Sequence, residues 1–145
     1  MSRRESREHS LRFLFQMEFH DNDDIDVLKE RFLEEAGLKD NELNYFNNIV
    51  DGVFRLREQL DDIYSIYLKN WNLSRVARID QTILRIATYE ITYIDDVPFN
   101  VSVSEAVVLA KKYSTEESRA FINGVLKNLE NSKNKEIIIT EETEI

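Results

Sequence analysis

Apolar residues recur at intervals of three and four along most of this chain of 145 residues, which is the spacing of amphipathic helices. One run, beginning near Asp40, keeps this pattern for about 28 residues, so we expect a bend or break within it. With three glycines and one proline, the chain has too few turn residues for an all-β protein. The pattern therefore predicts a compact all-α domain of six helices, or seven if the long one is interrupted.

Residues suited to helix ends divide the chain at several places. Gly37 can end the second helix in a left-handed conformation. Pro98 marks the end of the fourth helix, and Ser102 with Glu105 has the spacing of a capping box for the fifth. Thr115 can cap the sixth helix. These positions predict short connections between the later helices.

The last residues differ from the rest in composition. Residues 132–145 are acidic and rich in isoleucine, with no neighbouring strand for Ile137–Ile139 to pair with. We therefore expect a helical domain over residues 1–131 and a flexible acidic tail over residues 132–145. Gly124 costs a helix about 1 kcal/mol relative to alanine, so we expect another helix to approach closely there.

The sequence contains few of the residue patterns typical of enzymes. Because the chain has no cysteine, disulfides and thiolate metal sites are excluded, and a reducing, cytoplasmic compartment is expected. The sequence shows neither a signal-peptide pattern nor an apolar run long enough for a membrane helix, so we expect no membrane-spanning segment. There is no glycine-rich phosphate loop and no Ser/His/Asp set. The acidic pairs Asp61–Asp62 and Asp95–Asp96 could hold Mg²⁺, although such charges are usually solvated helix ends. We expect a protein that is not an enzyme and has no cofactor or metal.

The net charge of −9 argues against nucleic acid as a partner only if it is spread evenly. Residues 18–62 alone account for −9, whereas residues 1–17 carry +2 and residues 63–145 carry −2. The acidic middle could meet a basic protein partner. The two ends of the chain are locally basic and could contact RNA weakly, with a strong dependence on salt.

Arginines at the start of the chain form the first candidate site. Arg3, Arg4 and Arg7 are three and four residues apart, so they share one face of a helix and present forked donors to phosphates. Pairing of Arg4 with Glu8 within the helix is the alternative. Cations at a helix start oppose the helix dipole, which favours a ligand role.

A polar turn between the last two predicted helices forms the second candidate site, with Lys111, Lys112, Ser118 and Arg119. Lysines at a helix end also suit the helix dipole, and the acids that open the next helix would compete with a phosphate. Phe15 could stack on an RNA base, although aromatics at helical spacing are usually core residues. We expect both basic sites to form one RNA-binding face.

Three segments carry a resemblance to a known family: RRESRE near the start, LSRVARIDQTILRIATYEI at residues 73–91, and VPFNVSVSEAVVLAKKYSTEESRAFINGVL at residues 97–126. In order and spacing they resemble the NusB family of bacterial transcription antitermination factors over roughly residues 3–130. The resemblance implies an all-helical fold of two small helical bundles packed side by side.

The resemblance also implies a function. Members of the family bind the boxA element of nascent RNA, together with the small-subunit ribosomal protein NusE, and join NusA and NusG on RNA polymerase to support ribosomal RNA synthesis. A protein-only scaffold for the basic ribosomal partner is the alternative. Some relatives dimerise, so a homodimer is an alternative state of the free protein. A similar domain begins some RNA cytosine methyltransferases. Because this sequence continues into no α/β catalytic domain, we do not expect such an enzyme unless the chain is a fragment.

The resemblance assigns roles to particular positions. Phe15 stands where the family often has tyrosine and so lacks a hydroxyl, and Asp80 stands where it often has glutamate. Asp80 and Glu117 are implied to belong to a partner or regulatory surface. The full set implied or expected to contact RNA is Arg3, Arg4, Arg7, Phe15, Asp80, Lys111, Lys112, Ser118, Arg119 and Phe121.

Overall fold

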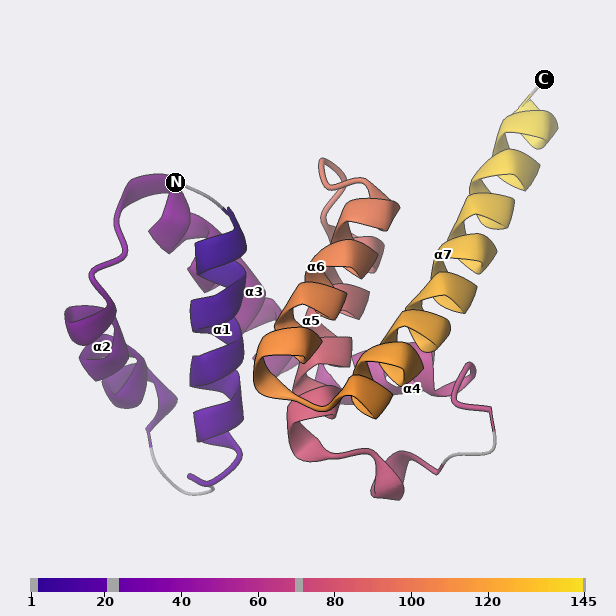
Figure 1. Ribbon diagram of the computed structural model, residues 1–145. Coiled ribbons are helices and arrows are strands. Elements are labelled where there is room, and N and C mark those ends of the chain that lie inside the picture. The colour runs from indigo at the N-terminus through magenta and orange to yellow at the C-terminus, as the bar shows by residue number, and fades with distance from the viewer. Residues whose placement is uncertain (1–2, 21–23, 70–71, 145) are drawn as a thin grey trace. The chain divides into compact units, whose positions relative to one another are not determined.

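The computed structural model describes residues 3–20, 24–69 and 72–144, with side chains up to residue 135. Within those ranges the chain forms α-helices, one 3₁₀ turn and no strand (Figure 1), which confirms the predicted all-α class. No helix in these ranges combines the length and apolar character needed to cross a membrane. The elements are α1 (Arg3–Met17), α2 (Ile25–Ala36), α3 (Asp40–Arg55), α4 (Arg57–Ser65), η1 (Leu73–Arg75), α5 (Arg78–Tyr93), α6 (Phe99–Tyr113) and α7 (Glu116–Glu144).

The helices divide into two compact units, Met1–Arg57 and Glu58–Ile145. The division falls at the interruption expected in the long helical run. Leu56 leaves the helical conformation, with φ −106° and ψ 18°, and separates α3 from α4. One predicted segment is thus two helices, and seven α-helices are present in the described ranges, as the prediction allowed.

In the first unit, three phenylalanines join α1, α2 and α3. The ring of Phe13 makes edge contacts with Phe32, at 5.3 Å between centroids, and with Phe46, at 6.0 Å. Phe32 and Phe46 stack at 5.7 Å with 9° between their planes. Phe13 and Phe46 are almost fully buried. Such aromatic pairs contribute about 0.5–1.5 kcal/mol each beyond the burial of their area, so the cluster fixes α2 against the other two helices.

In the second unit, α5 is the central helix. Every residue from Thr82 to Ile91 is buried except Arg85. A helix that is buried on nearly all sides must be surrounded by other elements, and both α6 and α7 pack on it. The side chains that those two helices bury include Val103, Ala106, Ala110, Ile122, Val125, Leu126 and Leu129.

Two of the predicted helix ends are confirmed. Gly37 has a left-handed φ of 70°, and its N–H donates to the Leu33 carbonyl at 3.1 Å, which closes α2. The Thr115 hydroxyl accepts a hydrogen bond from the Ser118 N–H at 3.0 Å at the start of α7. Both are local interactions of the kind that a sequence can reveal.

The capping box predicted at Ser102 is wrong. α6 already begins at Phe99, and Ser102 is buried inside the helix. The earlier start follows from Pro98, which ends the preceding connection with φ −59° and whose carbonyl accepts the Ser102 N–H at 3.3 Å. Proline lacks an N–H and has a fixed φ, so it suits the residues that open a helix.

The end of α7 also differs from expectation. The helix continues to Glu144, through the segment for which the sequence predicts a flexible tail, and Figure 1 shows it extending beyond α5 and α6. Residues 132–144 contain neither proline nor glycine, so nothing in them interrupts a helix that has already formed. The close approach expected at Gly124 is wrong, since this residue is exposed and a Cβ there would meet nothing within 4 Å.

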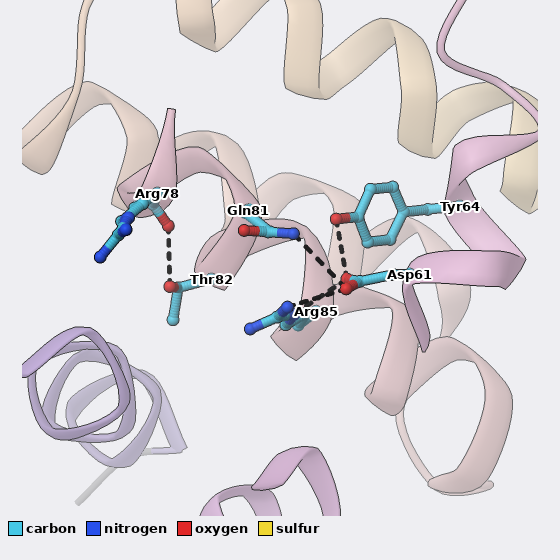
Figure 2. A network of polar contacts seen from close by, with 6 residues as sticks. All are labelled: Asp61, Tyr64, Arg78, Gln81, Thr82 and Arg85. Atoms are coloured by element: carbon cyan, nitrogen blue, oxygen red, sulfur yellow. Dashed lines mark hydrogen bonds and ion pairs between the residues drawn. The ribbon is translucent and has the colours of Figure 1, made fainter. Parts of the chain in front are cut away.

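A polar network joins α4 to α5 (Figure 2). The Asp61 carboxylate accepts two hydrogen bonds from Arg85, from Nε at 2.8 Å and from Nη2 at 2.7 Å. The Tyr64 hydroxyl donates to it at 2.9 Å and the Gln81 amide at 3.4 Å. The side chains of Asp61 and Arg85 are each only 12% exposed. The carboxylate that the sequence offered as a cation ligand is therefore engaged by an arginine.

Replacing Arg85 with alanine should lower the free energy of unfolding by about 3 kcal/mol, because Asp61 would stay largely buried without its ion-pair partner. Urea unfolding at pH 7 measures this. The matched control Arg75→Ala, which removes an exposed arginine of η1, should change the stability by less than about 0.5 kcal/mol. Equal effects of the two substitutions would contradict the structural role of the network.

Burial, reinforced by the negative charge of Asp61, raises the pKa of Tyr64. Above a pH of about 10, the unfolded chain loses this proton while the folded chain keeps it. The stability that this difference contributes is therefore complete below pH 10 and falls at higher pH, by up to about 1.4 kcal/mol per pH unit. The Tyr64→Phe variant has no phenol proton, so its free energy of unfolding does not fall in this way. The difference between its free energy of unfolding and that of the wild type should therefore shrink between pH 9 and pH 11. Urea unfolding of both proteins tests this, and a constant deficit would refute it.

Candidate nucleic-acid interface

The first turns of α1 carry the arginine cluster predicted from the sequence. Arg3 and Arg4 are exposed, whereas Arg7 is only 4% exposed. Arg3 is the first residue of the helix, so the two exposed guanidinium groups lie at its N-terminal end. Two of these arginines can therefore meet a ligand from solvent, while the burial of Arg7 leaves it little surface for direct contact with a phosphate.

An aromatic ring of α3 holds two of these arginines. The Cζ atom of Arg3 lies 4.5 Å from the centroid of the Tyr45 ring, and that of Arg7 lies 5.7 Å from it. Tyr45 is itself buried. Attraction between a cation and an aromatic face contributes about 0.5–2 kcal/mol. Tyr45 is not among the site residues predicted from the sequence, because it sits one residue before Phe46 and just off the apolar stripe of α3.

Small side chains allow α1 and α3 to approach closely at this point. The Ser6 hydroxyl donates to the Glu42 carbonyl of α3 at 2.9 Å, and the Ser10 hydroxyl donates to the Ser6 carbonyl at 2.7 Å. Both serines are fully buried. Their short side chains let the two helices come together, and each serine hydroxyl has a hydrogen-bond partner.

The aromatic candidate on α1, Phe15, is only partly exposed. Its ring makes an edge contact with Phe19 at 5.4 Å between centroids. Phe19 is 62% exposed and extends this pair into solvent. Phe19 was not among the predicted site residues, and it lies two residues beyond the end of α1, in the turn that follows the helix.

In the second unit, Asp80 organises the junction between α6 and α7. Its carboxylate accepts hydrogen bonds from the Ser114 hydroxyl and from the Ser118 hydroxyl, each at 2.6 Å. Asp80 is only 4% exposed. Because Asp80 belongs to α5 and the serines flank the α6–α7 connection, this carboxylate ties the connection to the central helix. Short, charge-assisted bonds of this kind are among the stronger hydrogen bonds in proteins.

The cations of this junction lie at its surface. Lys111 and Lys112 are exposed in the last turn of α6. Arg119 lies 3.6 Å from the carboxylate of Glu116, which is itself largely exposed, so water weakens this ion pair. Glu117 is also exposed. The first turn of α7 thus adds acids beside the lysines, as the sequence suggested.

The predicted site residues therefore fall into two groups. Unit 1 holds the arginines and Phe15, and unit 2 holds the residues around the α6–α7 junction, including the half-buried Phe121. Within each unit, residues from different helices are brought together by an aromatic ring or a carboxylate. The joining of the two groups into one RNA-binding face stays a prediction.

Comparisons with known proteins agree on one family. The model of the NusB family matches residues 4–131. The transcription antitermination protein NusB of Acetivibrio thermocellus is 42% identical over 126 residues, which cover 87% of this chain and 86% of that protein.

Solved structures give the same match. T. maritima NusB, 34% identical, aligns with a TM-score of 0.80 over 90% of this chain and 92% of that one. A structure of the antitermination factors NusB and NusE in complex with dsRNA contains a chain that aligns with a TM-score of 0.78. That chain is 23% identical, and the alignment covers 90% of this chain and 96% of that one. At that identity the likeness concerns the fold alone.

Replacing Asp80 with alanine should lower the free energy of unfolding by about 2–3 kcal/mol, because two hydrogen bonds to a buried charge are lost. Urea unfolding measures the effect. Hydrogen exchange should also speed up at the start of α7. The control Asp95→Ala removes an exposed carboxylate and should have an effect below about 0.5 kcal/mol. An Asp80 variant as stable as this control would show that the carboxylate does not hold the junction.

Proposed function

This chain belongs to the NusB family, and on that premise we propose that it is a transcription antitermination factor that binds boxA RNA together with the ribosomal protein NusE. In this role it joins RNA polymerase with NusA and NusG in the cytoplasm and supports transcription of ribosomal RNA operons. It acts by binding and not by catalysis. Residues 1–131 carry the RNA-binding part.

The observation that carries this proposal is the position of the exposed cations. The chain has a net charge of −9, which repels RNA at a distance. Despite this net charge, two pairs of cations are exposed. One pair is Arg3 and Arg4 at the start of α1, and the other is Lys111 and Lys112 at the end of α6. Each can contact a phosphate, and each contact releases counterions, so the affinity falls as the salt concentration rises.

The two cationic groups serve the same RNA in this proposal, one from each unit. Four phosphate contacts to a single strand give a slope of log affinity against log salt of about −3. Such a small number of contacts, on an acidic protein, makes the RNA complex weak without a partner. NusE then contributes the additional binding energy.

The acidic segment supports NusE as the partner. Residues 18–62 carry a net charge of −9 and include α2 and α3 of unit 1. A basic ribosomal protein is complementary to such a segment, and this complementarity speeds association. The proposal draws further support from the relatives that are named as transcription antitermination proteins and from the similar fold of a NusB solved with NusE and dsRNA.

The same acidic segment favours a second candidate function, a scaffold that binds the ribosomal partner with little RNA contact. The burial of Arg7, which removes one of the expected phosphate contacts, points in this direction. The two functions differ in one result. A scaffold binds NusE equally well with and without RNA, whereas an RNA-binding factor binds RNA more tightly when NusE is present.

Reversing one pair of exposed cations should weaken the binding of boxA RNA. We expect Arg3→Glu with Arg4→Glu, and separately Lys111→Glu with Lys112→Glu, each to raise the Kd and to reduce the salt slope by about 1.4, the share of two phosphate contacts. Gel shifts across a salt series, with and without NusE, measure both quantities.

The control is Arg31→Glu with Arg55→Glu, which changes the net charge equally at exposed positions on α2 and α3. It should leave the salt slope within about 0.5 of the wild-type value. If only one of the two test pairs affects binding, the shared RNA surface is wrong. If neither does, the RNA-binding function itself is wrong and the scaffold is favoured.

A further inference from the structure

A polar hollow of about 850 Å³ lies in unit 1, beside the arginine cluster. Its wall includes Arg3 of α1, Lys39 just before α3, and the exposed face of the first half of α3. Its volume is within the range of pockets that hold a small organic group. Every residue that lines it belongs to the first unit, so the hollow is complete within that unit.

Three asparagines form one side of the hollow. Asn41, Asn44 and Asn48 are spaced by three and four residues, so they follow one face of α3, and all three are exposed. Each side-chain amide carries both a donor and an acceptor. This combination matches the edge of a nucleobase, and asparagine pairs with adenine in this way. This row is not among the residues predicted from the sequence, and the signal that could have found it is one residue type repeated at helical spacing.

The charges that line the hollow cancel. Arg3 and Lys39 are opposed by Asp40 and Glu42, which line the same space. A site for an isolated phosphate needs an excess of positive charge, which this hollow lacks. A neutral ring with donors and acceptors at its edge suits the lining better, while a phosphate attached to that ring can lie at the rim near Arg3.

Arg3 also supplies a surface for stacking. Its guanidinium lies 4.5 Å from the centroid of the Tyr45 ring, which positions it at the edge of the hollow. Tyr45 is itself only 7% exposed, so a ligand would meet the guanidinium and not the phenol ring. Unpaired RNA bases stack on guanidinium planes as they do on aromatic side chains.

We propose that this hollow takes one unpaired base of the bound RNA, which stacks on Arg3 and is read by the amides of Asn41, Asn44 and Asn48. The inference rests on the proposed RNA-binding function and adds a base-reading subsite to it. Phosphate contacts alone fix the position of RNA without reading its sequence. The hollow supplies what the exposed cations lack, a set of neutral groups that can distinguish one base from another.

The test uses the full chain, NusE and fluorescent boxA RNA, with Asn41→Ala and Asn44→Ala combined. The loss of base-edge hydrogen bonds should raise the Kd about tenfold. The salt slope should stay at the wild-type value, because amides release no counterions. The control Asn100→Ala with Asn131→Ala removes two exposed amides of unit 2 and should leave the Kd unchanged. Circular dichroism checks folding, and Asn44→Leu, of similar size, replaces the double variant if that variant unfolds.

A second set of RNAs, each with one abasic position, locates the base. At one position, removal of the base should weaken wild-type binding about tenfold and should not weaken binding of the asparagine variant further, because both changes remove the same contact. Additive effects at every position, or an unchanged Kd for the variant, would overturn the subsite while leaving RNA binding intact. Loss of NusE binding alone would assign the hollow to the protein partner and overturn the subsite as well. A wild-type protein that fails to bind RNA would overturn both the function and the subsite.

Discussion

The burial of α5 is the constraint on which the second unit depends. Burying a charged side chain is costly unless it is paired, and two charged side chains of this nearly covered helix find partners on neighbouring segments. Arg85 meets Asp61 of α4, and Asp80 meets the serines on either side of the α6–α7 connection. These two carboxylates therefore determine where α4 and the junction lie relative to α5. The exposed lysines at the end of α6 are held in place by the same arrangement.

The proposed function depends on how charge is distributed and not on its total. An acidic protein can bind RNA only where a few cations are exposed and held in position, because each flexible side chain that is immobilised on binding costs free energy. Because Arg3 is already stacked on Tyr45 in the folded protein, part of its side-chain entropy is lost during folding and not on binding. Few phosphate contacts also mean that sequence preference must come from neutral groups, and the asparagine row on α3 is the set that we assign to this task.

Local features of the fold could be predicted from the sequence, and pairings between distant residues could not. The helical stripes, the left-handed Gly37 and the Thr115 cap each depend on residues a few positions apart. The buried role of Asp80 depends on serines that are 34 and 38 positions away, and the burial of Arg7 depends on an aromatic ring of α3. The capping-box prediction at Ser102 failed for another reason, because Pro98 starts the same helix earlier in the chain.

The central claim is that exposed cations from both units contact one RNA. Photo-cross-linking of boxA RNA that carries 4-thiouridine, followed by mass spectrometry of the protein, tests it most directly. The account predicts cross-linked peptides from the start of α1 and from the α6–α7 junction, and their loss at high salt. Cross-links confined to one unit, or found mainly on the exposed face of α2, would contradict it.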